Sequence, residues 1–491
     1  MDIDRFFTLG PQLPFQAHDV FTDREPFIAA FYERALLLTR RSGPAADLMD
    51  FQRPADNVLA FVGNGGLGKS TLLRELVRLV IDGTLQGLPG SCAGAVVDFA
   101  DAGSRSFETI LLRVRAALGC LGGGWSAFDL ALSVYWERKH PGESLTGFLK
   151  KTTTLGRVAD STQVADQIST TVDALFAGGL GLVGFGVHLA QLAREAGGRG
   201  IALRRIRRDL SAFDVILAEQ EPDRMLGYLP LLLAYDLEHH RTTTSTLAVV
   251  VFDTFEEVQA APCERSGLED LVVRLVYLMP NVLFLAGSRR PLAWPDPVRS
   301  VGLTYGGAAR WPGLVDNPRP VDQFSLDGFR PATADLYLQT RLTHDEQPAI
   351  PAEIRRRIIE GADGSPHYLE LSAGLFEQIA ARGEEPQPDL FGLPFPELVL
   401  STMRDLDETD RDLLRAAALL SAFDIGVLAA ALPQVRQRRI EEFTRRSFVH
   451  HEPGVWPPFR LHENLRATRH LALAWHVAGS RPLPRCPPGS P

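Results

Sequence analysis

The chain has 491 residues, enough for about three domains, and 45% of its residues are hydrophobic against 23% charged. These proportions exclude a mostly disordered or collagen-like chain, and a formal net charge of −9 argues against a protein that chiefly coats nucleic acid. The four cysteines are widely separated and have no metal-ligand spacing, and the N-terminus has no apolar core of signal-peptide length. A cytoplasmic protein is therefore expected.

In the first two thirds of the chain, short apolar runs alternate with helical patterns. After a helical pattern at 27–36, strands are predicted at 57–62, 93–99, 246–252, 281–286 and 321–326. A helix is predicted at 70–81, and a mostly helical stretch from about 104 to 240 contains candidate helices at 111–118, 128–136, 158–175 and 201–217. Strands separated by helices predict an α/β fold with a parallel sheet of about five strands.

After residue 330 the sequence favours helices. They are predicted at 332–342, 352–359, 394–404, 408–420, 425–432 and 437–446. A small hairpin is predicted between 448–451 and 458–461, and helices followed by such a hairpin are typical of a winged helix. The proline-rich tail 476–491 is expected to be disordered.

A glycine-rich loop follows the first strand. Its residues Gly63-Asn64-Gly65-Gly66-Leu67-Gly68-Lys69-Ser70 match G-x-x-x-x-G-K-[ST] and precede a predicted helix, the context that this phosphate-binding motif requires. Glycines let the backbone N–H groups turn toward phosphates, and Lys69 is expected to reach the β- and γ-phosphates. Ser70 is the expected Mg²⁺ ligand, and Thr71 is a candidate contact of the α-phosphate.

The strand 246–252 leads into Asp253, a carboxylate in the right place to hold Mg²⁺ opposite Ser70. Thr254 follows it, so no acid comes directly after Asp253, and Glu256 or Glu257 is the candidate for orienting the attacking water. The alternative is that both glutamates only cap the next helix. Arg289, just after the strand 281–286, is a candidate contact of the γ-phosphate.

With these residues in place, the sequence resembles the STAND branch of the P-loop NTPases, which are kin to NB-ARC domains and more distantly to AAA+ proteins. The resemblance covers about residues 18–475. Residues 20–25 (VFTDRE) resemble the F-x-G-R-E motif that lines the adenine pocket, which implicates Phe21 and Arg24, although Asp23 stands where glycine is usual. Gly287-Ser288-Arg289 resembles the T-T-R sensor.

Two further motifs of the resemblance lie after residue 330. Gly364-Ser365-Pro366 resembles the G-x-P motif of a helical lid, whose proline packs near the adenine. His462, within Leu461-His462-Glu463, stands where the family's winged helix carries M-H-D, and there the histidine contacts the β-phosphate of ADP and locks the closed state.

The resemblance implies an order of domains. A leader at 1–17 would precede a nucleotide-binding domain at 18–330 with a helical insertion at about 104–240. A helical lid at 331–390 and a winged helix at 391–475 would follow. The cofactors would be ATP or ADP with Mg²⁺, and the function would be a slowly hydrolysing switch that opens and forms homo-oligomers when ATP is bound. Because no effector domain or sensor repeats are recognised, a separate effector or sensor protein is the expected partner.

Two other functions compete with the switch: an ATP-controlled DNA-binding regulator and a nucleotide-binding scaffold that hardly hydrolyses. Arginines of the predicted winged helix (Arg436, Arg438, Arg439, Arg445 and Arg446) would suit an ATP-controlled DNA-binding regulator, although such charged helix faces are most often only solvated. The glycine-rich apolar segment 174–193 has the length of a membrane span, but it lies inside the helical insertion, where a buried or regulatory loop is favoured.

Overall fold

The structure is a computed structural model that describes residues 24–41, 48–151, 158–175, 201–259, 267–315, 321–344, 347–348, 350–393, 408–420, 422–444, 449–451 and 457–461. The chain divides into two compact units. The first comprises Arg24–Asn64 and Gly68–Leu326. The second comprises the described residues from Asp327 onward, together with the loop tip Gly65–Leu67.

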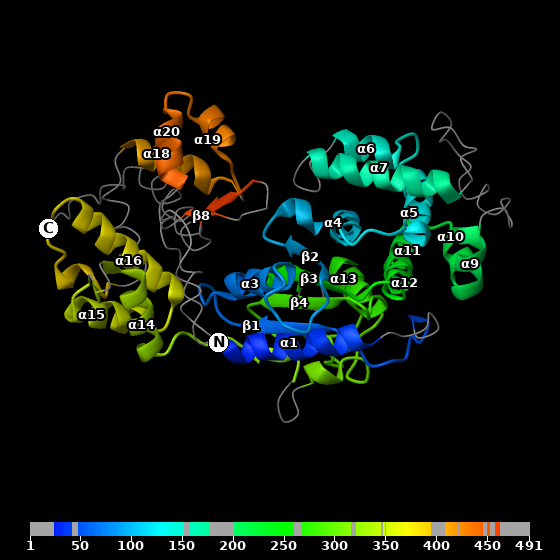
Figure 1. Cartoon of the computed structure of the whole chain (residues 1–491), viewed down its shortest axis with the longest axis horizontal. Coiled ribbons are helices and arrows are strands. Elements are labelled where there is room, and N and C mark those ends of the chain that lie inside the picture. The colour runs from blue at the N-terminus through cyan, green and yellow to red at the C-terminus, as the bar shows by residue number, and fades with distance from the viewer. Residues whose placement is uncertain are drawn as a thin grey trace, which may run out of the picture. The chain divides into compact units, whose positions relative to one another are not determined.

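A parallel sheet forms the centre of the first unit (Figure 1). Its strands are β1 (Val58–Val62), β2 (Ser91–Asp98), β3 (Thr246–Asp253), β4 (Leu283–Ser288) and β5 (Gln323–Ser325). Within the described residues the sheet has five strands in the order β2-β3-β4-β1-β5, and every neighbouring pair is parallel. All residues of β3 and β4 are buried, as near-continuous apolar runs predict for strands covered on both faces. The predicted parallel α/β sheet is therefore confirmed.

Helices α1 (Glu25–Arg40), α3 (Lys69–Ile81) and α13 (Gly267–Leu278) surround this sheet (Figure 1). Helix α3 buries leucines and valines at helical spacing against the strands. It approaches β4 closely at Gly287, where a Cβ atom would lie only 2.6 Å from Leu73 Cδ1. Glycine at this position therefore lets α3, which begins at the phosphate loop, pack directly over the end of β4.

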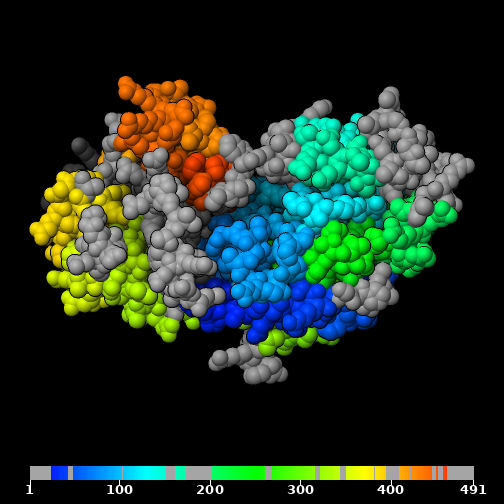
Figure 2. All heavy atoms as spheres, in the orientation of Figure 1, coloured from blue at the N-terminus to red at the C-terminus, as the bar shows by residue number. Residues whose placement is uncertain are grey.

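The described residues between β2 and β3 are mostly helical, as expected. It contains η3 (Ala102–Arg105), α4 (Phe107–Gly119), α5 (Ser126–Lys139), α6 (Leu145–Lys151), α7 (Val158–Leu175), α9 (Ile201–Asp209), α10 (Phe213–Ala218), α11 (Pro222–Leu226) and α12 (Leu229–Arg241). Helices α6 and α7 lie on the outer side of α4 and α5 (Figures 1 and 2). An ion pair between Arg115 and Asp129 (Nε to Oδ1, 2.8 Å) is fully buried between α4 and α5.

The structure corrects one prediction for this region, and a second prediction falls largely outside the described residues. The single helix predicted at 201–217 is wrong in one respect, because the chain turns at Leu210–Ala212 and forms two helices, α9 and α10. The apolar segment 174–193 lies outside the described residues from position 176 onward. Among the helices that the structure describes, none is long and apolar enough to cross a membrane.

The second unit has its own apolar core, which includes Tyr337, Leu369, Leu414 and Phe443. Its elements are α14 (Pro331–Arg341), β6 (Thr343–His344), β7 (Gln347–Pro348), α15 (Ala352–Ala362), α16 (Pro366–Ala381), η6 (Pro388–Leu390), α18 (Glu408–Ala418), α19 (Ile425–Ala431), α20 (Gln437–Thr444), β8 (Val449–His451) and β9 (Phe459–Leu461). Strands β8 and β9 pair antiparallel. The expected hairpin is present, whereas the predicted helix at 394–404 lies outside the described residues. The division of this unit into a lid and a winged helix stays a prediction.

Candidate nucleotide-binding site

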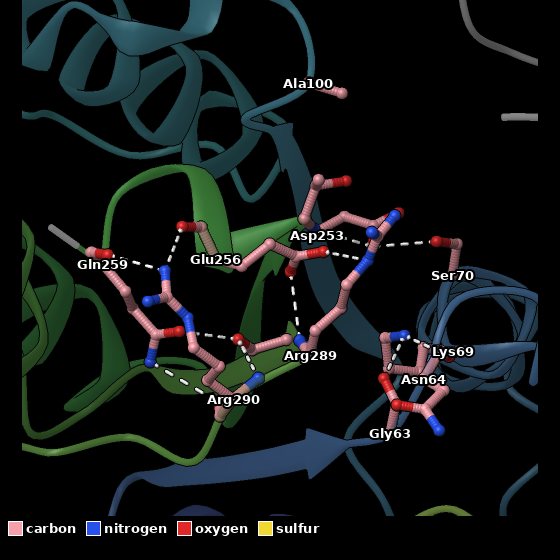
Figure 3. A network of polar contacts seen from close by, with 12 residues as sticks. Gly63, Asn64, Lys69, Ser70, Ala100, Asp253, Glu256, Gln259, Arg289 and Arg290 are labelled. Carbon is pink, nitrogen blue, oxygen red and sulfur yellow. Dashed lines mark hydrogen bonds and ion pairs between the residues drawn. The ribbon is translucent and has the colours of Figure 1, made fainter. Parts of the chain in front are cut away.

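The phosphate loop connects β1 to α3. Gly66 and Gly68 both have φ near +82°, in the left-handed region that glycine adopts without strain, and Gly68 stands at the N-cap of α3. The Lys69 ammonium donates hydrogen bonds to the carbonyls of Gly63 (2.7 Å) and Asn64 (2.9 Å), so it lies across the start of the loop (Figure 3). Thr71 follows in the first turn of α3.

Asp253, at the end of β3, meets Ser70 at the start of α3. The Ser70 hydroxyl donates a 2.9 Å hydrogen bond to Asp253 Oδ1, although the two residues are 183 positions apart in sequence. A hydroxyl and a carboxylate that converge in this way are oxygen donors of the kind that Mg²⁺ takes, and the pair therefore fits the expected metal.

Burial raises the pKa of Asp253 to about 6. The Arg74 guanidinium, with Nη2 at 3.5 Å from Oδ2, acts in the opposite direction, whereas the neighbouring Asp98 raises the pKa of Asp253 further. Only 3% of the Asp253 surface is exposed, so a nearby cation strongly stabilises its charged form. A carboxylate that binds a metal ion lies in such surroundings.

The two candidate glutamates differ in their surroundings. They lie in the short helix η4 (Phe255–Glu257) that follows Asp253. Glu256 Oε1 pairs with Arg289 Nε at 2.9 Å, and Glu256 Oε2 accepts from the Arg289 backbone N–H at 3.2 Å (Figure 3). Glu257, with 44% of its side chain exposed, pairs instead with Arg105 at 2.8 Å. The structure therefore joins Glu256, and not Glu257, to the arginine at the end of β4.

A polar network links the residues next to Arg289 to the turn that carries Glu256 (Figure 3). The Ser288 hydroxyl donates to Gln259 Oε1 at 2.8 Å, and Arg290 Nη2 donates to the carbonyls of Glu256 (3.1 Å) and Gln259 (2.7 Å). Neither Gln259 nor Arg290 was among the predicted residues. The only signal in the sequence is that Arg290 directly follows the predicted sensor.

The remaining predicted contacts lie elsewhere or outside the described residues. Arg24 is buried at the N-cap of α1, where its guanidinium lies 5.8 Å from the Phe27 ring centroid. Pro366 begins α16 in the second unit. Phe21 and His462 fall outside the described residues.

Two of the arginines that suggested DNA binding, Arg438 and Arg439, are engaged in ion pairs. Arg438 pairs with Glu442 at 3.1 Å, and Arg439 pairs with Glu442 and with the buried Asp410, both at 3.3 Å. Arg445 and Arg446 lie outside the described residues. The described helix α20 carries two arginines and two glutamates, and DNA binding stays a prediction.

Comparisons with known proteins find similarity at the level of structure. No protein-family model matches the chain, and no curated protein matches its sequence. Among solved structures, a Walker-type ATPase of Pyrococcus abyssi is similar over 94% of this chain and 99% of its own, at 15% identity and a TM-score of 0.31. The sheet order, with a phosphate loop between β1 and α3 and an aspartate at the end of β3, fits the fold of a P-loop NTPase.

Proposed function

We propose that the protein is an ATP-binding switch of the STAND type that hydrolyses ATP slowly. One observation carries the nucleotide-binding part of this proposal: the Ser70 hydroxyl and the Asp253 carboxylate meet at 2.9 Å beside a loop that matches the phosphate-binding motif at every fixed position. A glycine-rich turn that contained a lysine by coincidence would not be expected to bring its serine hydroxyl into a hydrogen bond with a buried carboxylate.

In this proposal the loop binds the triphosphate through its backbone N–H groups and the N-terminus of α3. Lys69 exchanges its bonds to the Gly63 and Asn64 carbonyls for the β- and γ-phosphate oxygens. Ser70 and Asp253 would hold Mg²⁺, which would neutralise the charge that develops on the phosphate oxygens.

Glu256 is the residue that we assign to the attacking water, because it faces Arg289 at the end of β4 while Glu257 is paired with Arg105. The same ion pair offers a reason for slow turnover. While Glu256 is bound by the side chain and backbone of Arg289, each of its carboxylate oxygens has one acceptor site occupied, which leaves fewer sites for the attacking water. Contact of Arg289 with a γ-phosphate would release the acid.

The hydrolytic assignment is tested by ATP turnover of three variants beside the wild type. Asp253→Ala should abolish Mg²⁺-dependent turnover, because the buried carboxylate is lost. Glu256→Gln should lower the rate by about 10²-fold or more while nucleotide affinity stays within a few-fold. Glu257→Gln is the matched control and should turn over as the wild type does. The reverse order of the two glutamine variants would make Glu257 the acid.

The switch itself would link the second unit to the nucleotide. ADP would hold a closed state through Pro366 and His462, and exchange for ATP would release that state and expose a surface for homo-oligomers and a separate effector or sensor protein. This part of the proposal rests on the family resemblance. The described residues after Asp327 form helices and a hairpin, as that resemblance requires.

A further inference from the structure

Thr254, the residue that replaces the usual acid after Asp253, has an unusual backbone. Its φ of +55° and ψ of +41° lie in the left-handed region, where a β-branched residue is rare. Such a conformation persists only where the surroundings determine it, and it is concentrated at functional sites. The contacts of Thr254 indicate what the conformation achieves.

Three polar groups of Thr254 are used at once. Its backbone N–H turns back to donate to Asp253 Oδ1 at 2.9 Å. Its hydroxyl donates to Asp98 Oδ1 at 3.0 Å. Its carbonyl accepts from the Glu257 N–H at 3.1 Å and so begins η4, the turn that carries Glu256. One residue therefore fixes both the carboxylate at the end of β3 and the start of the turn with the proposed acid.

Asp98 is the anchor of this arrangement. It ends β2 directly beside Asp253 in the strand register and is 9% exposed. The Ala100 N–H, at the top of Figure 3, also donates to Asp98 Oδ1 at 3.0 Å, which fixes the carboxylate to its own strand end. Two like charges on neighbouring strands repel, so a purely structural role would be served better by a neutral acceptor.

We infer that Asp98, acting through the Thr254 hydroxyl, is a positioning residue of the metal site. It holds Thr254 in the left-handed conformation, and Thr254 in turn aims Asp253 toward Ser70 and sets the start of η4. This inference rests on the proposed function. It gives a role to Thr254, for which the sequence indicated none. Asp98 and Thr254 do not touch nucleotide or metal in this account.

The test uses the full chain and follows binding of a fluorescent ADP analogue while Mg²⁺ is titrated, with a chelator series for binding without metal. Thr254→Val removes only the hydroxyl, and Thr254→Ser keeps it. We expect Thr254→Val to weaken the apparent Mg²⁺ affinity about 10- to 100-fold, because residues that orient metal ligands have effects of this size. Binding without Mg²⁺ should change little, and Thr254→Ser should lie within about threefold of the wild type.

Three further variants complete the test. Thr254→Gly removes the hydroxyl and also the backbone strain, so it should fold at least as well as the wild type yet lose Mg²⁺ affinity as Thr254→Val does. Asp98→Ala should lose it too, and if that variant does not fold, the Thr254 series decides. Thr242→Val, at an exposed hydroxyl bonded to the His239 carbonyl, is the matched control and should bind as the wild type does.

The outcomes separate the two proposals. Wild-type Mg²⁺ affinity in Thr254→Val or Thr254→Gly would overturn the role of Asp98 and Thr254 and leave the proposed function intact. A wild-type chain that binds no nucleotide, with or without Mg²⁺, would overturn both.

Discussion

Asp236 is a carboxylate enclosed by protein at the start of α5. It accepts from the backbone N–H groups of Phe128 (2.9 Å) and Ala127 (3.2 Å), and so it caps that helix from α12. Burial raises the pKa of Asp236 to about 8, while these two hydrogen bonds act in the opposite direction. Because the folded chain holds this proton more tightly than the unfolded chain, where the pKa is about 4, folding and protonation are linked.

The linkage has a definite sign. Between about pH 4 and 8 the folded state binds more protons at Asp236 than the unfolded state, so this group's contribution to the free energy of unfolding falls as the pH rises. Asp236→Asn should remove that contribution, on the order of 1 kcal/mol per pH unit. Urea unfolding at pH 5.5 and 7.5 measures it. The exposed Asp223 gives the control variant Asp223→Asn, and equal pH dependence in Asp236→Asn and the wild type would contradict the prediction.

At the candidate site, the residues of the phosphate motif, Asp253 and Arg289 could be chosen from the sequence because each follows an apolar strand. Arg74 and Asp98 could not. Arg74 is one of many helical arginines, and only the packing of α3 on β3 brings it within 3.5 Å of Asp253. Asp98 does end a predicted strand, but its importance depends on β2 being the neighbour of β3, which strand order in sequence does not determine.

The choice between Glu256 and Glu257 was open for a similar reason. Adjacent residues of a short turn point in different directions, and the turn itself begins at the left-handed Thr254, which no propensity would indicate. The side-chain directions follow from that one backbone angle.

At the scale of elements, the strands were predictable because buried parallel strands are short, continuous apolar runs. Helix α16 was harder to recognise, because the residues from His367 to Phe376 are buried on every side and show no polar face. Its buried Glu370 faces Arg341 of α14 at 3.4 Å, and that ion pair explains a charge that pattern alone would assign to the surface.

The break between α9 and α10 was not predicted, because the sequence pattern is continuous there. Residues 201–217 keep helical spacing throughout, yet Leu210 is fully buried and Phe213 N–H bonds to its carbonyl in a turn. Tertiary packing of both short helices against the insertion overrides the continuous pattern there.

At the scale of the whole molecule, the proposed switch requires the second unit to sense the nucleotide. His462→Ala should remove one hydrogen bond to the β-phosphate in the closed state, about 1–3 kcal/mol, and thereby shift the ratio of open to closed molecules roughly 5- to 150-fold. Faster ADP release and a larger oligomeric fraction are expected, by dissociation kinetics and by size exclusion with light scattering. If neither property changes, the locking role of His462 must be given up.

The central claim is that this chain binds ATP through Lys69, and a nucleotide titration tests it most directly. Lys69→Ala should weaken ATP binding roughly tenfold or more, because a charge-assisted contact to the β- and γ-phosphates contributes about 1.5–3 kcal/mol. Lys139→Ala removes a lysine whose ammonium pairs with Asp223 in the helical insertion and should bind as the wild type does. Equal affinity in Lys69→Ala and the wild type, or no binding by the wild type, would contradict the account.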